Sequence, residues 1–159
     1  MGLQTARNEK IAVLLRENLR VARTISARLP TACLPQLRYL TETFSLSIML
    51  GDLQWLDRSW YATHSGLLRL ACRSGCAGIQ TELAYALCDF SKVRYVFRAT
   101  VFRSSRCKGF VGYGDADPSN VSQLVRGAEM RVAETRAVNR ALRKAYGIGL
   151  CSVEELGAA

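Results

Sequence analysis

One continuous pattern near the end of the sequence constrains the fold more than any other feature. It runs from Phe110 to Leu156 and opens with a strand-like segment that ends in Gly112-Tyr113-Gly114. A helical repeat without interior proline follows, and it predicts one long helix from about Ser119 to Tyr146. Pro118 suits the first turn of that helix, and Gly147 suits the left-handed residue just beyond its end.

The two faces of this predicted helix differ in charge. The apolar face is broad and rich in small residues, so it can pack closely on a sheet. At about 100° per residue, the basic side chains share a sector of roughly 100°. Such a stripe is either a solvated surface or a binding surface for a polyanion, and the helix alone leaves both interpretations open. The stripe consists of Arg126, Arg136, Arg140, Arg143 and Lys144.

Alternating apolar residues upstream of the helix predict strands. A shorter run over Ile79–Leu83 is a further possible strand, and Ser152 with Glu155 has the spacing of a capping box. We therefore expect an α+β fold, in which an antiparallel sheet (a hairpin plus a β-meander) packs against one long helix as a β-β-β-α core. The main predicted strands are Phe44–Leu50, Trp55–Ala62, Val93–Phe102 and Cys107–Gly114.

The first part of the chain has a different pattern. Gln4–Leu29 forms an amphipathic helical repeat, and Pro30 and Pro35 are expected to end it. This helix could pack on the domain or on a neighbouring subunit. We therefore divide the chain into an N-terminal helical segment, 1–40, and a single domain, 41–159.

The charge balance indicates the class of partner. The 159 residues include 22 basic and 13 acidic side chains, which gives a net charge of +9 and favours nucleic acid over a membrane surface. No run of 18 apolar residues occurs, so no membrane partner is expected. The arginine-rich start contains acidic residues and lacks the apolar core of a secretion signal, so we expect an intracellular location in the cytoplasm or nucleoid.

The six cysteines do not form a motif for chemistry. They are scattered through apolar contexts, and we expect reduced, mostly buried thiols. Cys72 and Cys76 could share a helix face with His64, but zinc sites usually have tighter paired spacing and a second pair. We expect no metal site and no cofactor.

The order of these motifs resembles the single-strand annealing proteins of homologous recombination, the Rad-fifty-two, Erf and DdrA relatives. Gly112-Tyr113-Gly114 leads into a long helix that ends with Arg140-Ala141-Leu142-Arg143 and then Gly147. Tyr61–Glu82 is similar to the family's hairpin-to-helix segment. The resemblance covers roughly residues 44–150. It implies a non-catalytic protein that binds single-stranded DNA, anneals complementary strands in recombination and repair, and assembles into homo-oligomeric rings or filaments.

The resemblance also implies a basic groove for the DNA backbone. The two arginines of the family's helix motif fall on Arg140 and Arg143, and the basic residue of its hairpin falls on Arg103. Two positions depart from the family. Asn139 stands where some relatives have a basic residue, and Gly66 stands at a basic position of the short helix, with Arg69 one turn later. The candidate nucleic-acid-binding residues are Arg69, Arg94, Arg98, Arg103, Lys108, Arg126, Arg136, Arg140, Arg143 and Lys144.

Two other functions fit parts of the pattern. A magnesium-dependent nuclease could use Asp115 and Asp117 with Glu42 or Glu82, because carboxylates near a strand end can hold a metal ion against phosphate. A basic RNA-binding module without annealing activity would explain the charge equally well. Tyr113 could stack on a base or belong to the core.

Overall fold

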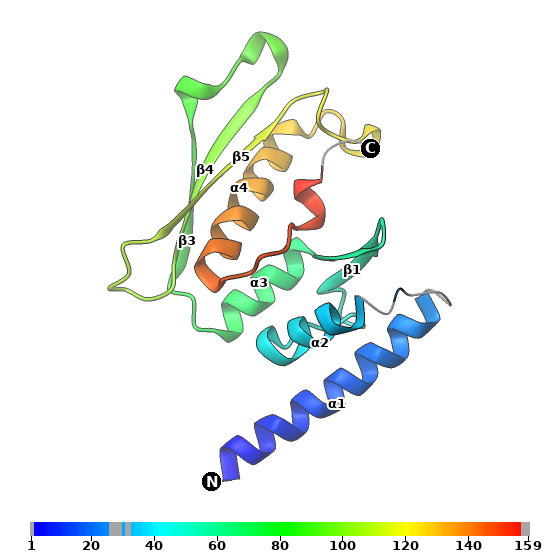
Figure 1. The fold of residues 1–159 in the computed structure, drawn as a ribbon. Coiled ribbons are helices and arrows are strands. Elements are labelled where there is room, and N and C mark those ends of the chain that lie inside the picture. Colours follow the sequence, from blue (N-terminus) through cyan, green and yellow to red (C-terminus); the bar gives the residue numbers. More distant parts are fainter. Residues whose placement is uncertain (1, 26–29, 31–32, 157–159) are drawn as a thin grey trace.

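The chain adopts an α+β fold with antiparallel sheets (Figure 1). The computed structural model describes residues 2–25, 30 and 33–156. Within these ranges no helix is long and apolar enough to cross a membrane. The described elements are α1 (Gly2–Ile25), α2 (Cys33–Phe44), β1 (Leu53–Leu56), β2 (Ser59–Ala62), α3 (His64–Arg73), β3 (Gly78–Leu83), β4 (Tyr95–Phe102), β5 (Phe110–Ala116) and α4 (Glu129–Tyr146), with short 3₁₀ turns at 85–87, 90–92, 123–125 and 153–155.

The predicted strand Phe44–Leu50 is wrong. Helix α2 includes Pro35 in its first turn and continues to Phe44, and a loop and turn follow it. Asn18 of α1 explains this, because its buried amide donates to the Leu46 carbonyl at 2.8 Å and accepts from the Ile48 N–H at 2.9 Å. These are the backbone bonds that a partner strand would otherwise make. The predicted division at residue 40 falls inside α2.

The single strand predicted over Trp55–Ala62 is wrong, because the chain reverses within it and forms a small hairpin. Strands β1 and β2 pair with each other, with Leu53 opposite Ala62, instead of pairing with an earlier strand. Asp57 and Arg58 form the turn, both with positive φ, as a two-residue hairpin turn requires. The sequence lacks the usual Asn-Gly signal there, so the turn could not be placed from local chemistry.

The main sheet has the order β3-β4-β5 and is antiparallel throughout, which confirms the antiparallel pairing but not the single sheet predicted, because β1 and β2 form a sheet of their own. Helix α4 crosses β4 and β5 on one face (Figure 1). The crossing is close because Gly112 and Gly114 face the helix backbone, where a Cβ atom would meet backbone atoms at less than 3.0 Å. Only alanines line the facing stripe of the helix, and they are fully buried: Ala133, Ala137 and Ala141.

We expect Gly114→Ala to lower the free energy of unfolding by about 1–3 kcal/mol, because the added methyl group would overpack against the α4 backbone. Gly78→Ala is a matched control in β3, where nothing lies within 4 Å of the added Cβ. Gly78→Ala should leave the free energy of unfolding unchanged or raise it slightly. Urea denaturation of both variants measures the difference in stability. Equal denaturation midpoints would contradict the close packing of β5 against α4.

Helix α4 begins ten residues later than predicted, at Glu129 instead of Ser119. Gly127 has a φ of 87°, which an α-helix does not allow, and residues 119–126 form turns. Arg126 therefore lies outside the helix, and Leu124, two residues before it, is 96% exposed. The end of the helix is confirmed, because Gly147 is the left-handed C-cap.

The cysteines are all free, but most are not buried. Cys33 is buried, Cys72 and Cys151 are exposed, and the other three are intermediate. Exposure of Cys72 follows from its position on α3, whose buried face is formed by Gly66, Leu67, Leu70 and Ala71. The described residues contain no group of three or more His, Cys, Asp or Glu side chains placed to hold a metal ion.

Candidate nucleic-acid interface

Three basic side chains of α4 lie along the outer edge of β5. They are spaced four residues apart, and each donates to one backbone carbonyl, so that together they reach every second carbonyl of the strand. The repeat is possible because four helical residues rise about 6 Å and two strand residues about 6.7 Å. The bonds cover outward carbonyls of an edge strand. They join Arg136 to Asp115 at 2.8 Å, Arg140 to Tyr113 at 2.8 Å and Lys144 to Val111 at 2.7 Å.

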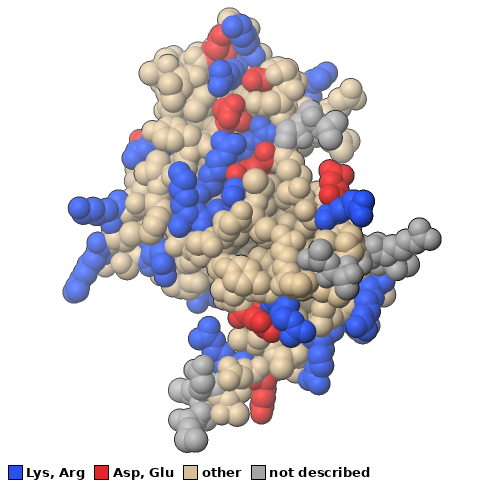
Figure 2. All heavy atoms as spheres, viewed as in Figure 1, with Lys and Arg blue, Asp and Glu red and all other residues tan. Residues whose placement is uncertain are grey.

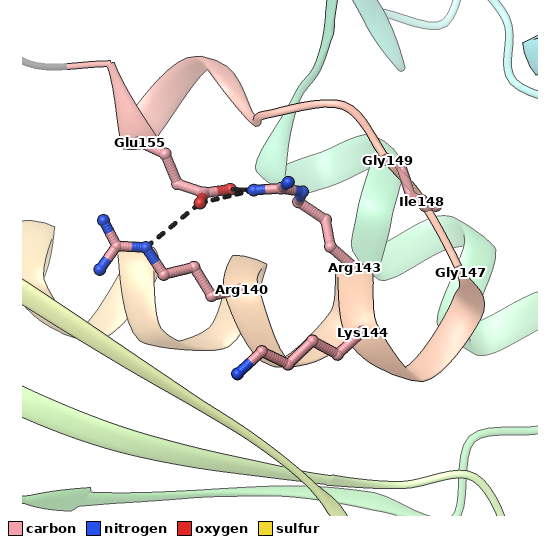
Figure 3. Close-up of a pocket in the computed structure, with 7 residues that line it drawn as sticks. All are labelled: Arg140, Arg143, Lys144, Gly147, Ile148, Gly149 and Glu155. Atoms are coloured by element: carbon pink, nitrogen blue, oxygen red, sulfur yellow. Dashed lines mark hydrogen bonds and ion pairs between the residues drawn. The ribbon is translucent and has the colours of Figure 1, made fainter.

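A cavity of about 410 Å³ opens beside the C-terminal half of this row (Figure 3). Arg140, Arg143 and Lys144 line it from α4, and Glu155 lines it from the turn after the helix. The segment Gly147–Gly149 forms the remaining wall. Three cations around one carboxylate leave a net positive charge at this opening, which suits a phosphate group.

Glu155 organises the cavity. Its side chain is only 5% exposed, and its two oxygens accept from Arg143 at 2.8 and 2.7 Å and from Arg140 Nε at 3.2 Å. Ser152 adds backbone and hydroxyl donors, as the predicted capping box requires. Burial opposes ionisation, but the donors from Arg143 and Ser152 outweigh it and lower the pKa of Glu155 below its ordinary value. Arg143 is therefore largely committed to this carboxylate.

Arg136 does not belong to the exposed surface. It is 5% exposed, and its guanidinium donates five hydrogen bonds to oxygens of Asp115, Asn120, Glu154 and Leu156. Burial among these mostly neutral oxygens lowers the pKa of its guanidinium, although nearby carboxylates oppose that shift. The predicted DNA-binding residue Arg136 is thus a clamp that joins the turn after β5 and the C-terminal turn to α4.

Arg103 lies in the β4–β5 hairpin, near the C-terminal end of α4. Its guanidinium lies 5.4 Å from the ring centre of Tyr146, the last residue of α4. Lys108 is exposed in the same hairpin. Figure 2 shows this face, where basic side chains gather along α4 and project from the hairpin. We call Arg103, Arg140, Arg143 and Lys144 the basic cluster.

The other predicted residues lie outside the basic cluster. Arg69 donates to the buried carboxylate of Asp52 and to the Leu50 carbonyl, both at 2.6 Å, so it holds the turn before β1. Arg94 lies 3.7 Å from Asp115. The remaining two have acidic neighbours of their own, since Arg98 pairs with Glu82 and Arg126 lies near Glu129.

The two departures from the annealing-protein pattern have structural causes. A side chain at Gly66 would meet the backbone of Asp52 at less than 3.0 Å, so no basic residue fits there. Asn139 is fully buried, and its amide nitrogen donates to Ser152 at 2.8 Å. Its oxygen therefore faces His64 Nδ1 at 2.6 Å, and that ring nitrogen must be the donor. A charged side chain in place of Asn139 would break this buried network.

Of the carboxylates considered for a nuclease, Asp115 and Asp117 both accept from Asn120 Nδ2, whereas Glu42 and Glu82 lie on α2 and β3. Asp117 accepts from the Ser119 backbone N–H at 2.8 Å, and these hydrogen bonds lower its pKa, although burial opposes the shift. Asp115 faces Arg94 and Arg140 at 3.7 Å each. The other two pair locally, Glu42 with Arg38 and Glu82 with Arg98.

Sequence reasoning missed the role of Glu155 and the His64–Asn139–Ser152 network. The capping-box spacing located Ser152 and Glu155 correctly, but it gave no sign that the same carboxylate would bind two arginines of α4. For Asn139, the sequence pattern indicates only that a basic residue found in some annealing proteins is absent at this position. No protein-family model, curated protein or solved structure matches this chain, so the interface is described from its own geometry.

Proposed function

We propose that this protein binds the phosphate backbone of single-stranded DNA and anneals complementary strands. The observation that carries the proposal is the basic cluster, where three cations of α4 and one buried carboxylate line the same cavity and Arg103 lies at the C-terminal end of that helix. A cluster with this excess of charge attracts a polyanion, and arginine forks bind phosphate with two parallel hydrogen bonds.

Arg140 is the residue best placed for phosphate contact. Its side chain is 37% exposed, and its Nη2 atom has no hydrogen-bond partner among the described residues. Lys144 is exposed one turn later. Arg143 is 18% exposed and contributes mainly by neutralising Glu155, which would otherwise repel a phosphate.

Annealing follows from backbone binding without covalent chemistry. A protein that holds a single strand by its phosphates leaves the pairing edges of the bases available to a complementary strand. The resemblance to annealing proteins supports this step, and it also supports homo-oligomeric assembly and a role in homologous recombination and repair. Under this proposal the protein is not an enzyme.

The test combines annealing and binding. Two complementary labelled oligonucleotides should pair faster with the protein than without it. With about three exposed phosphate contacts per subunit, the affinity for single-stranded DNA should fall roughly 20-fold between 50 and 200 mM salt. Affinity that does not change with salt, or an unchanged pairing rate, would contradict the proposal. The same binding measurement with an RNA strand distinguishes a protein that binds any single strand from one that binds DNA specifically.

A further inference from the structure

Strand β5 presents one aromatic ring on the face of the sheet opposite α4. Side chains alternate along a strand, so Tyr113 points away from the helix that Gly112 and Gly114 face. Tyr113 is 46% exposed. Figure 1 shows the described helices on the other side of this sheet. The Tyr113 ring is therefore not part of the hydrophobic core, although aromatic residues on strands usually are.

Arg98 is the cross-strand partner of Tyr113. Glu82 lies opposite Arg98 on the other neighbouring strand and forms an ion pair with its guanidinium, so the three side chains follow one another across β3, β4 and β5. The group combines a flat aromatic surface with a cation. Surfaces of this composition bind the bases of single strands in a sequence-tolerant way.

The backbone of the same tyrosine connects this face to the basic cluster. The Tyr113 carbonyl accepts from Arg140 Nη1 at 2.8 Å, at the outer edge of β5. One residue thus places a stacking ring on the open face and a phosphate-binding guanidinium at the adjacent edge. A strand that runs along this edge can place its phosphates on Arg140 and Lys144 and turn a base onto the ring.

We propose that Tyr113 stacks on a nucleobase of the single strand whose phosphates the basic cluster holds. This inference rests on the proposed function. It adds a reason why the protein would bind single-stranded DNA and not duplex DNA, because bases stacked in a duplex have no free face for the Tyr113 ring. Stacking uses the face of the base and leaves its pairing edge free, which annealing requires.

The experiment compares binding of an oligothymidylate and of an abasic oligonucleotide with the same length and charge. Tyr113→Leu should weaken binding of the oligothymidylate about 5- to 150-fold, the range expected for one stacked base. Its binding of the abasic strand should equal that of the wild type. Tyr113→Phe should keep both affinities. Tyr85→Leu is the matched control, since Tyr85 is 71% exposed on the connection between β3 and β4.

A second readout does not depend on the affinity of a leucine variant. In Tyr113→Trp, the added indole emission should be quenched by oligothymidylate and unchanged by the abasic strand. Equal losses on both strands for Tyr113→Leu, or no quenching in Tyr113→Trp, would overturn the stacking proposal and leave backbone binding intact. Wild-type protein that binds neither strand would overturn the proposed function itself.

Discussion

Replacing Arg136 by methionine should lower the free energy of unfolding by about 3–5 kcal/mol. The substitution removes five hydrogen bonds from a charged donor and leaves buried carbonyl groups without partners. Those carbonyls belong to the end of β5, to the turn after it and to the C-terminal turn. Arg136→Lys should be destabilising as well, because an ammonium group cannot reproduce the planar fork.

Arg131→Met is the control for this prediction, because Arg131 is exposed on the same helix and carries the same charge. It should alter stability by less than about 0.5 kcal/mol. Chemical denaturation of both variants gives the comparison. Arg136→Met with the stability of Arg131→Met would mean that the clamp contributes nothing and that Arg136 is free to bind a ligand.

The close packing of β5 on α4 could be predicted from the sequence because its signals are local. Gly112 and Gly114 alternate along a strand, and three alanines recur every four residues on the helix, so two small-residue surfaces must face each other. The ends of the elements follow from local chemistry too. Gly147 has the conformation that a helix end needs, and Ser152 with Glu155 forms the capping box.

The errors arose where a feature other than hydrophobic periodicity decides the structure. The alternation over Phe44–Leu50 is real, but Asn18 supplies the backbone hydrogen bonds of that segment and leaves no need for a strand partner. The start of α4 depends on Gly127, whose positive φ interrupts a pattern that is otherwise helical. Neither effect has a signature in hydrophobic periodicity.

The candidate site was predicted in outline and not residue by residue. Arg136 and Arg140 are one turn apart and chemically identical, yet the first is buried and the second is partly exposed. The difference comes from Asn120 and the carbonyls of residues 154–156, which lie in irregular segments. Arg143 was grouped with Arg140, but its guanidinium is bound by Glu155 in two hydrogen bonds.

This difference decides which substitutions test DNA binding. Arg143→Ala would remove two of the five hydrogen bonds that the buried Glu155 carboxylate accepts, so it would affect folding and binding together. Arg140→Ala with Lys144→Ala removes two exposed cations and leaves Arg143 paired. We expect this double variant to fold and to lose at least tenfold in affinity for single-stranded DNA, because two of about three exposed phosphate contacts disappear.

The control for the double variant must remove the same charge from another surface. Arg16→Ala with Arg20→Ala does so on α1, where both side chains are exposed and lie outside the basic cluster. The two double variants have equal net charge, so any difference between them reports the position of the charges and not their number. The annealing rate should follow affinity in each variant, since strand holding is the only activity proposed.

The salt dependence of single-strand affinity in these three proteins tests the central claim most directly. For the wild type, the logarithm of affinity should fall with the logarithm of salt concentration with a slope of about 2, given roughly three phosphate contacts. The slope should drop by about 1.4 in the Arg140/Lys144 double variant and stay at the wild-type value in the Arg16/Arg20 double variant. A folded Arg140/Lys144 double variant with wild-type affinity and slope would contradict the assignment of the basic cluster as the DNA-binding site.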